Sequence, residues 1–439
     1  MMAAAAIALP TLAAAFVLRR GGRPWPLCAA LALPCAIGLS SLVWWLLLWV
    51  LPSSATGRIA IDTAIWLLAA WCWRPRSLPR ERTRRLAWLR TPSALLCLVV
   101  CAVAVTAFAA TSRVQPHGEW DAWAIWNLRA RFLFLATNWR DGLSPLMPWS
   151  HPDYPLLLPL SVARIWTYAG HDTQAVPIAL AALFAATSVA IVGISVGTAR
   201  SASLGWYAAA AVAGSPAFIR YTPSQCADLP LAAYVLVSVL SLGEGLTTAA
   251  RAPWVMAGIG AGLAAWTKNE GLVFCLLIIA AAVLAPCPDQ TRSRATRCGY
   301  LVVGTVPMLG ALGLLKLITP SNDLLAAGTL SSALSHLHEL DRWQTVAGRF
   351  WHELWYSGAS LVGVLPAVVA FVGLRGLQKP VAVGPATGLA VVALLVTTYA
   401  LVYVVTPQDL EWHLNTSVDR VLLQVYPAAI WCAMMLVRS

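Results

Sequence analysis

The sequence predicts an all-α integral membrane protein with about thirteen transmembrane helices. Two properties carry this prediction. First, 59% of the 439 residues are hydrophobic and only 11% are charged, whereas about a quarter of the residues of soluble domains are charged. Second, apolar runs long enough to cross roughly 30 Å of hydrocarbon recur along the whole chain. The net charge of +12 does not indicate a nucleic-acid partner, because the charges lie between these apolar runs.

A length of about 20 residues per span places the transmembrane helices in order along the chain. They are expected at residues 3–18, 26–51, 58–74, 92–111, 175–197, 203–219, 228–246, 253–266, 269–286, 299–318, 354–374, 387–405 and 421–437. The first run resembles a signal peptide, but its basic residues follow the apolar run, so we interpret it as a retained span. Most of the ten cysteines fall inside apolar runs, which argues against a disulfide framework.

The loops between these spans alternate in charge. One set holds eighteen of the 30 Lys and Arg residues but only three of the 18 acidic residues. By the positive-inside rule this set is cytoplasmic, so most acids lie on the outer face. The long outer loops are expected at residues 112–174, 319–353 and 406–420, and loops of this length are usually functional or disordered. The chemistry of the protein is therefore predicted on the outer face.

The first outer loop contains "HGEWDAWAIWNLRARF" at residues 117–132, which suits an amphipathic helix in the membrane interface. Its three tryptophans and Arg129 are interpreted as an aromatic belt with a snorkelling arginine. Glu119 and Asp121 are different, because carboxylates so close to the end of a span are costly if they turn inward. These two acids are therefore candidates for a functional role.

Further motifs follow on the same face of the predicted membrane topology. They are "HPDYPLLLPL" at 151–160, "SQCADLPLA" at 224–232, "WTKNEGLVF" at 266–274 and "TPQDLEWHLNTSVDRVLLQVYP" at 406–427. In this order, after "EWD" and an amphipathic segment, they resemble the polytopic GT-C glycosyltransferases. That superfamily includes the bacterial family 39 type, the protein O-mannosyltransferases and the aminoarabinose transferases of lipid A. The matches run from about residue 92 to the C-terminus.

The resemblance implies a GT-C fold with amphipathic interfacial helices in the first long outer loop. It divides the chain into N-terminal additional helices at 1–91, a catalytic core at 92–286 and C-terminal helices at 287–439. It also implies a multi-pass protein of the cell inner membrane whose active site faces the periplasm or exterior. The absence of an internal repeat in the sequence weakens a transporter interpretation.

Enzymes of this superfamily move a sugar from a polyprenyl phosphate to an acceptor. The implied partners are a polyprenyl-phosphate sugar donor, a glycan, lipid or protein acceptor, and membrane lipids, with no nucleic acid. Some relatives use a divalent metal such as Mg or Mn and others do not. The outer-face histidines show no i, i+4 pair, so the sequence does not demand a metal site.

Sugar transfer requires a base near the attacking hydroxyl. Asp121 matches the first-loop acid of the superfamily and is the predicted base, because partial desolvation raises the pKa of a carboxylate. Glu119 is the alternative, and it would otherwise act as a second acid at the acceptor site.

The transfer also requires cations around the departing phosphate. Lys268 and Arg420, at outer span ends, are the predicted donor-phosphate ligands. Structural ion pairs, of Lys268 with Glu270 and of Arg420 with Asp419 or Asp409, fit the sequence equally well. Further candidates for phosphate binding are Arg131 and His413.

Other polar residues of the motifs are predicted to shape the acceptor pocket. They are His151, Asp153, Tyr154, Asp228, Glu270 and Glu411. Asp228 fits the start of a helix equally well, where a carboxylate is favourable. In the loop 319–353, interleaved Leu, Trp and charged residues predict an amphipathic helix, either lining a groove for an isoprenoid tail or packing as a lid.

Two other classes of function stay open at this level. A transporter or flippase of a lipid-linked or anionic substrate would place ionisable groups near the middle of the bilayer. A non-catalytic membrane scaffold would leave the asymmetry of the acidic residues without a role.

Overall fold

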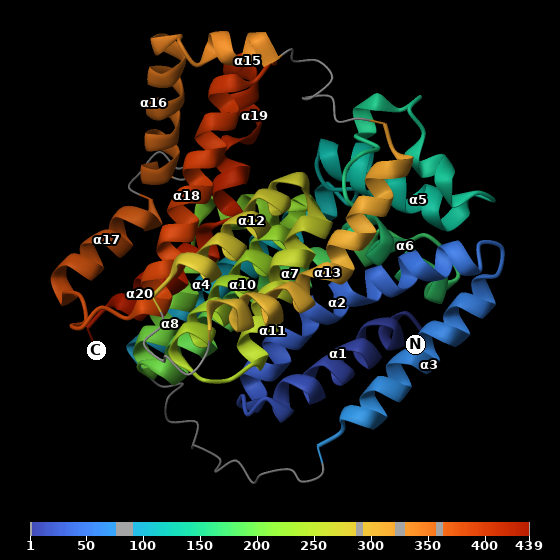
Figure 1. Ribbon diagram of the computed structural model, residues 1–439, viewed down its shortest axis with the longest axis horizontal. Helices are drawn as coiled ribbons and strands as arrows, with labels where there is room; N and C mark the ends of the chain where they lie inside the picture. Colours follow the sequence, from blue (N-terminus) through green and yellow to red (C-terminus); the bar gives the residue numbers. More distant parts are fainter. Residues whose placement is uncertain (1, 76–90, 287–292, 321–329, 357–362, 439) are drawn as a thin grey trace.

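The computed structural model describes residues 2–75, 91–286, 293–320, 330–356 and 363–438, and these residues form helices without any β-strand. The N-terminal helices are α1 (Met2–Arg20), α2 (Trp25–Val50) and α3 (Ala55–Trp73). After α4 (Pro92–Val114), the first outer loop holds a π-helical turn, η2 (Ala122–Trp126), α5 (Asn127–Leu135), two 3₁₀ turns, η3 (Trp139–Leu143) and η4 (Pro148–Ser150), and α6 (Leu157–Ala169). Figure 1 shows these elements from blue to green.

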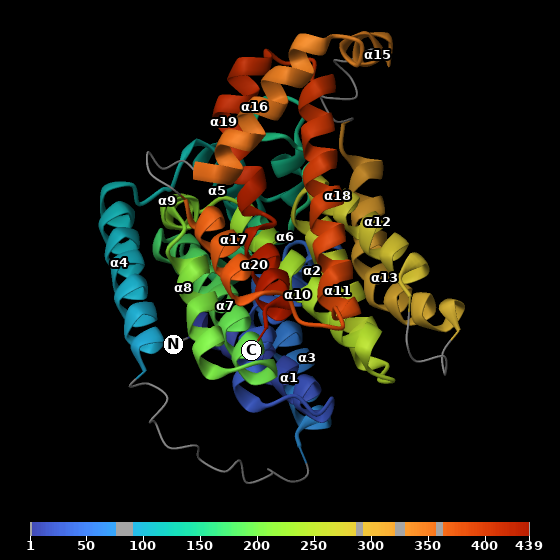
Figure 2. The same ribbon diagram turned by 90° about the vertical axis from the view of Figure 1, so that its left-hand side faces the viewer.

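The middle of the chain continues with α7 (Ala175–Ala199), α8 (Ala202–Ala213), α9 (Pro216–Tyr221), η5 (Thr222–Ser224), α10 (Asp228–Thr247), α11 (Ala252–Thr267) and α12 (Asn269–Leu284). The remainder is α13 (Arg294–Ile318), α15 (Leu330–His336), α16 (Leu340–Tyr356), α17 (Val364–Arg375), α18 (Val383–Val405), α19 (Leu410–Leu423) and α20 (Tyr426–Leu436). In Figure 2, α15, α16 and α19 lie at the top of the helix bundle, and α1 and α3 lie toward the bottom.

Seven of the described helices are long and apolar enough to cross a membrane: α1, α2, α4, α7, α10, α13 and α18. An eighth span is formed if α8 and the segment Pro216–Ser224, which bends by 60° from it, count as one. These helices confirm a multi-pass membrane protein by length and composition. Helices also occupy the other expected spans, but α11 and α12 have only 16 residues each. The count of thirteen spans therefore stays a prediction.

Three helix boundaries differ from the expected ones. Residues 157–169, which were expected within the first outer loop, form the buried helix α6. The prolines and the apolar composition of this segment did not predict a helix. The expected span at 354–374 begins inside the amphipathic helix α16, and α17 starts only at Val364. The expected span at 421–437 is divided between α19 and α20, because α19 continues to Leu423.

Close packing fixes α11 against α10 on one side and against α13 on another. A side-chain carbon at Gly258 of α11 would lie only 2.0 Å from the carbonyl oxygen of Leu301 on α13. Small residues allow membrane helices to approach this closely. Between α10 and α11, Ser238 Oγ donates a hydrogen bond of 2.7 Å to the carbonyl of Ala257. These contacts hold α11 against both of its neighbours.

Basic loops that are far apart in the sequence meet at one end of the bundle. Arg200 donates hydrogen bonds to the side chain of Gln378 and to the carbonyl of Val437. Arg23 forms an ion pair with Glu244. The charge pattern assigns these loops to one face, and the contacts agree with it for Arg200 with residues 378 and 437 and for Arg23 with Glu244. Which end is cytoplasmic stays a prediction of the positive-inside rule.

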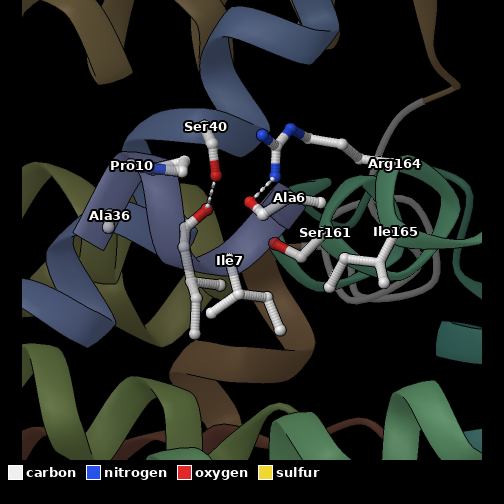
Figure 3. A pocket seen from close by; sticks show the side chains of 9 residues that line it. Ala6, Ile7, Pro10, Ala36, Ser40, Ser161, Arg164 and Ile165 are labelled. Carbon is white, nitrogen blue, oxygen red and sulfur yellow. Dashed lines mark hydrogen bonds between the residues drawn. The ribbon is translucent and has the colours of Figure 1, made fainter. Parts of the chain in front are cut away.

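A buried ion pair ties α6 to the N-terminal helices. Arg164 Nη2 lies 2.6 Å from Asp62 Oδ2, and Tyr168 donates a hydrogen bond of 2.6 Å to the same oxygen. Arg164 Nη1 also donates to the carbonyl of Ala6, as Figure 3 shows. The cavity beside Arg164 has a volume of about 10 Å³, which is room for one water molecule at most. This cluster is therefore a structural joint between α1, α3 and α6.

Candidate active site

The first outer loop docks on the turn that precedes α10. Gly118 has a φ of +75°, and a side-chain carbon there would lie 2.4 Å from the carbonyl of Ser224, so the chain requires glycine at this position. The next residue, Glu119, donates its backbone N–H to that carbonyl at 3.1 Å. Gln225 Nε2 donates to the carbonyl of Pro116 at 3.0 Å. These contacts bring the "EWD" motif to the start of α10.

Asp228, the first residue of α10, lies at the centre of a charged cluster and is only 3% exposed. Its Oδ2 accepts hydrogen bonds from Arg420 Nε at 3.1 Å and Nη2 at 2.8 Å. Its Oδ1 accepts from Lys268 Nζ at 2.9 Å and from Gln424 Nε2 at 2.6 Å. A buried charge is tolerated only when donors satisfy it in this way. Asp228 therefore holds both cations in place.

Two further carboxylates complete the cluster. Asp121 Oδ2 accepts a hydrogen bond of 2.6 Å from Arg420 Nη2, and Glu270 Oε1 lies 2.9 Å from Lys268 Nζ. Both side chains are 27% exposed, in contrast to Asp228. Three carboxylates thus surround two cations, and the five side chains carry a net charge of about −1 when all are ionised.

A second ion pair, between Asp153 and Lys316, is connected to this cluster through the backbone. Asp153, which is buried, accepts hydrogen bonds from Lys316 Nζ at 3.0 Å and from Asn269 Nδ2 at 3.1 Å. Asn269 follows Lys268 directly in the sequence. Lys316 lies in the last turn of α13, and its side chain is 36% exposed.

The residue before Arg420 in the sequence is another carboxylate, Asp419. Tyr221 donates a hydrogen bond of 2.5 Å to Asp419 Oδ2, and Arg220 Nη1 lies 3.6 Å from the same oxygen.

Burial raises the pKa of Glu119, and the charges of Arg420 and Arg220 oppose this effect only in part. A carboxyl group with a raised pKa holds a proton more readily, so Glu119 keeps its place as the alternative base.

The pKa of Lys268 also reflects its partners. Burial by itself lowers this pKa, but the carboxylates of Asp228 and Glu270 outweigh it, so the pKa lies well above its ordinary value. Lys268 therefore stays charged at neutral pH. Its ion pair with Glu270 confirms the structural alternative considered for this residue, and Asp228 is a partner that the motif alone did not indicate.

Arg420 differs from its expected structural alternative. Its guanidinium pairs with Asp121 and Asp228, and the described contacts include no pairing of the guanidinium with Asp419 or Asp409. Only its backbone N–H donates to Asp419 Oδ1, at 2.9 Å. This pairing arises because Arg420 lies on the face of α19 that packs toward the start of α10.

Arg129 and the third tryptophan of the loop also differ from the expectation. Trp120 and Trp123 are exposed, as an aromatic belt requires, but Trp126 and Arg129 are fully buried. Arg129 Nη1 donates to the carbonyl of Tyr154 at 2.9 Å, and Nη2 donates to that of Pro152 at 3.2 Å. Instead of snorkelling, Arg129 satisfies backbone carbonyls in the segment around Asp153.

Two predicted site residues lie away from the Arg420 cluster. Arg131 pairs with Asp172 at 3.2 Å on the surface of the outer loop and lines a separate small cavity beside His117. Glu411 is exposed in the first turn of α19. Neither arrangement supports the predicted roles, of Arg131 at the donor phosphate and of Glu411 in the acceptor pocket.

The two histidines of the motifs have neighbours of their own. The ring of His151 stacks on Tyr154 with centroids 4.7 Å apart. His413 Nδ1 lies 3.0 Å from Thr406 Oγ1, and its ring lies 4.5 Å from that of Tyr403. Burial lowers the pKa of His413, so its imidazole is neutral at neutral pH and does not supply a positive charge for phosphate.

Sequence reasoning missed three polar residues that the structure joins to the site. They are Lys316, Asn269 and Gln424. Lys316 lies three residues before the end of an apolar run, a position typical of a snorkelling lysine. Gln424 lies inside a predicted span. An uncharged polar residue within a long apolar run is the feature that could have identified it as part of the site.

No group of three or more His, Cys, Asp or Glu side chains suited to a metal ion occurs in the part of the chain that the structure describes. No family model, no curated protein and no solved structure matches the chain. The resemblance to GT-C enzymes therefore rests on the sequence motifs. The cluster itself combines a partly exposed carboxylate with a fixed arginine, which suits proton removal beside an anionic leaving group.

Proposed function

We propose that the protein is a GT-C glycosyltransferase that moves a sugar from a polyprenyl-phosphate donor to an acceptor hydroxyl. The reaction takes place at the outer face of the inner membrane, in a fold with about thirteen spans. The observation that supports this most is the 2.6 Å contact between Asp121, just before η2, and Arg420, in the last turn of α19. It places a proton acceptor beside a cation, and both are partly exposed.

In the proposed reaction, the acceptor oxygen bonds to the anomeric carbon of the sugar while the bond from that carbon to the phosphate oxygen breaks. Asp121 takes the hydroxyl proton, and the polyprenyl phosphate leaves with the electron pair. Arg420 donates to the charge that develops on the phosphate. Its Nε and Nη2 contact Asp228 and Asp121, whereas none of the described residues accepts a hydrogen bond from Nη1.

Arg420 links donor binding to the base. A donor phosphate competes with Asp121 for the same guanidinium group, because both are anions that pair with arginine. Donor binding then frees Asp121 for the acceptor hydroxyl. Asp228, which is closed to solvent, keeps Arg420 in position throughout the exchange.

The geometry supports the rival function, transport of an anionic or lipid-linked substrate, less well. The charged cluster lies at helix ends and turns, with Asp228 opening α10 and Lys268 between α11 and α12. A transport pathway would place ionisable groups near the middle of the bilayer.

A transfer assay tests the proposal. Full-length protein in nanodiscs is incubated with a panel of polyprenyl-phosphate-linked hexoses and pentoses, and the release of polyprenyl phosphate is measured with short alcohols or water as acceptors. We expect release with at least one donor. Arg420→Lys should raise the donor KM by about tenfold, because lysine keeps the charge but loses the fork of donors. The exposed Arg113, at the end of α4, provides the control variant Arg113→Lys.

Two results would contradict the proposal. Wild-type protein that neither consumes nor binds any donor of the panel would exclude this substrate class. Equal donor KM values for wild type and a folded Arg420→Lys variant would remove Arg420 from the phosphate site.

A further inference from the structure

A cavity of about 90 Å³ lies between α16, α18, α19 and α20, next to the candidate active site. Its walls are mostly leucine, valine and alanine side chains, including Val392 and Leu422. Two acids also line it, Glu353 from α16 and Asp419 from α19. Asp419 precedes Arg420 in the chain, so the cavity begins beside the charged cluster.

Glu353 has an unsatisfied oxygen at this cavity. Its side chain is only 4% exposed, and Oε1 lies 3.1 Å from Arg349 Nη2 and 3.7 Å from His352 Nδ1. Oε2 is buried, and no donor to it exists among the residues that the structure describes. A buried carboxylate oxygen without a donor is costly, and such atoms in proteins usually have a partner. Because Glu353 lines the cavity, a molecule bound there is the available source of the missing donor, once the carboxylate turns toward it.

The charges around the cavity indicate that this donor is neutral. Glu353 is already paired with Arg349, and Asp419 has Arg220 at 3.6 Å. Another cation is therefore not needed to balance the two acids. A carboxylate or a fully ionised phosphate has no hydrogen to donate to Oε2. A hydroxyl group satisfies Oε2 without adding charge, and the apolar walls require an apolar body behind it.

We infer that this cavity binds the hydroxyl end of an apolar alcohol, which donates its hydrogen bond to Glu353 Oε2. The volume holds the hydroxyl and the first few carbons, so the rest of a longer chain extends outside the cavity. The site is distinct from the donor-phosphate position, because the residues that line it do not include Arg420. This inference goes beyond the proposed function and does not depend on it.

Photolabelling of the full-length protein in nanodiscs tests the inference. The probes are a photoreactive C10 isoprenoid alcohol, a photoreactive straight-chain C10 alcohol, and the phosphate ester and the hydroxyl-free hydrocarbon of the isoprenoid. We expect an alcohol probe to label peptides of α16, α18, α19 or α20. The hydrocarbon and the phosphate ester should label the same peptides at least about tenfold more weakly. The two alcohols distinguish an isoprenoid from an acyl-type ligand.

Two variants separate the hydrogen bond from the space that the ligand fills. In Glu353→Gln the amide oxygen must face the donors Arg349 and His352, so its NH₂ group faces the cavity and the acceptor is lost. The alcohol concentration for half-maximal labelling should rise about tenfold. Ala429→Leu, on the cavity wall, should weaken labelling by filling the space. Glu339→Gln is the matched control, since Glu339 is 50% exposed at the start of α16.

Unchanged labelling of folded Glu353→Gln, or equal labelling by the hydrocarbon, would overturn the inference. If Glu353→Gln does not fold, Ala429→Leu and the comparison of probes on the wild-type protein decide the question. Unchanged labelling of folded Ala429→Leu would likewise contradict the site. A protein that binds the alcohol but transfers no sugar would refute the proposed function and leave this site standing.

Discussion

Exposure separates the roles of the carboxylates around Arg420. Asp228 is 3% exposed and accepts four hydrogen bonds from protein donors. Its oxygens are therefore occupied, and Asp228 acts as a positioning residue. Asp121 contacts the same arginine but is 27% exposed. Only a carboxylate that a substrate hydroxyl can approach serves as a base, so the two acids are not interchangeable.

Glu119→Gln is expected to raise the melting temperature at neutral pH. Burial raises the pKa of Glu119 above its ordinary value in the folded protein. The ionised Glu119 side chain therefore destabilises the folded state relative to the unfolded state. This cost is present above the unfolded pKa and disappears as the pH falls below it, because both states then bind the proton. Thermal unfolding of Glu119→Gln should therefore show a gain in Tm at pH 7.5 and none at pH 4.

Asp141→Asn is the control for this measurement, because Asp141 lies exposed in the same loop. A Tm of Glu119→Gln below that of wild type at pH 7.5 would show that the Glu119 carboxylate stabilises the fold.

Among the elements, α6 connects the N-terminal helices to the outer loop through Asp62 and Arg164. Loss of one partner leaves a buried charge unpaired, which typically costs about 3–5 kcal/mol. Asp62→Asn should therefore lower the free energy of unfolding by this amount in a denaturant titration. The double variant Asp62→Leu with Arg164→Met should recover most of the loss, because neither charge is then left alone.

A stability of Asp62→Asn within about 0.5 kcal/mol of wild type would be the value expected for a surface substitution. It would show that this ion pair does not join the N-terminal helices to α6.

Helix patterns predicted some elements and missed others for identifiable reasons. The alternation of apolar and charged residues in the loop 319–353 predicted an amphipathic helix, and α16 is that helix, with Val346 and Phe350 buried. The helix α6 was missed because the prolines at 155 and 159, around its start, favour a loop over a helix. The break between α19 and α20 was also missed, because hydropathy does not report a turn within an apolar run.

The site was predictable residue by residue but not as an assembly. Each of Asp121, Lys268 and Arg420 stands out as a charge at the end of an apolar run. Asp228 brings these residues together, and its contact with Arg420 joins positions that are 192 residues apart in the sequence. No local sequence pattern predicts such a contact. Arg131 has the same local signal as Arg420, yet it pairs with Asp172 elsewhere on the loop.

At the scale of the whole molecule, the charge split and the helix directions predict one orientation in the membrane. Single cysteines are introduced at Arg294 and Trp343 of a cysteine-free protein, and a membrane-impermeant reagent is added to intact cells. Trp343, which is 41% exposed on α16, should be labelled from outside. Arg294, at the start of α13, should be labelled only after the membrane is opened. The helix α13 separates the two positions, so labelling of both from one side would contradict the topology.

The central claim is that Asp121 removes the acceptor proton beside Arg420. Asp121→Asn keeps the shape of the side chain but removes the proton acceptor, and Asp141→Asn is the control in the same loop. With a donor that the wild-type protein uses, turnover of Asp121→Asn should fall by about 10² to 10⁴, the range typical of general-base loss. Donor binding should be retained or become tighter, because the cations that meet the phosphate are unchanged and the competing carboxylate is gone. Sugar transfer by folded Asp121→Asn at the wild-type rate would contradict the claim.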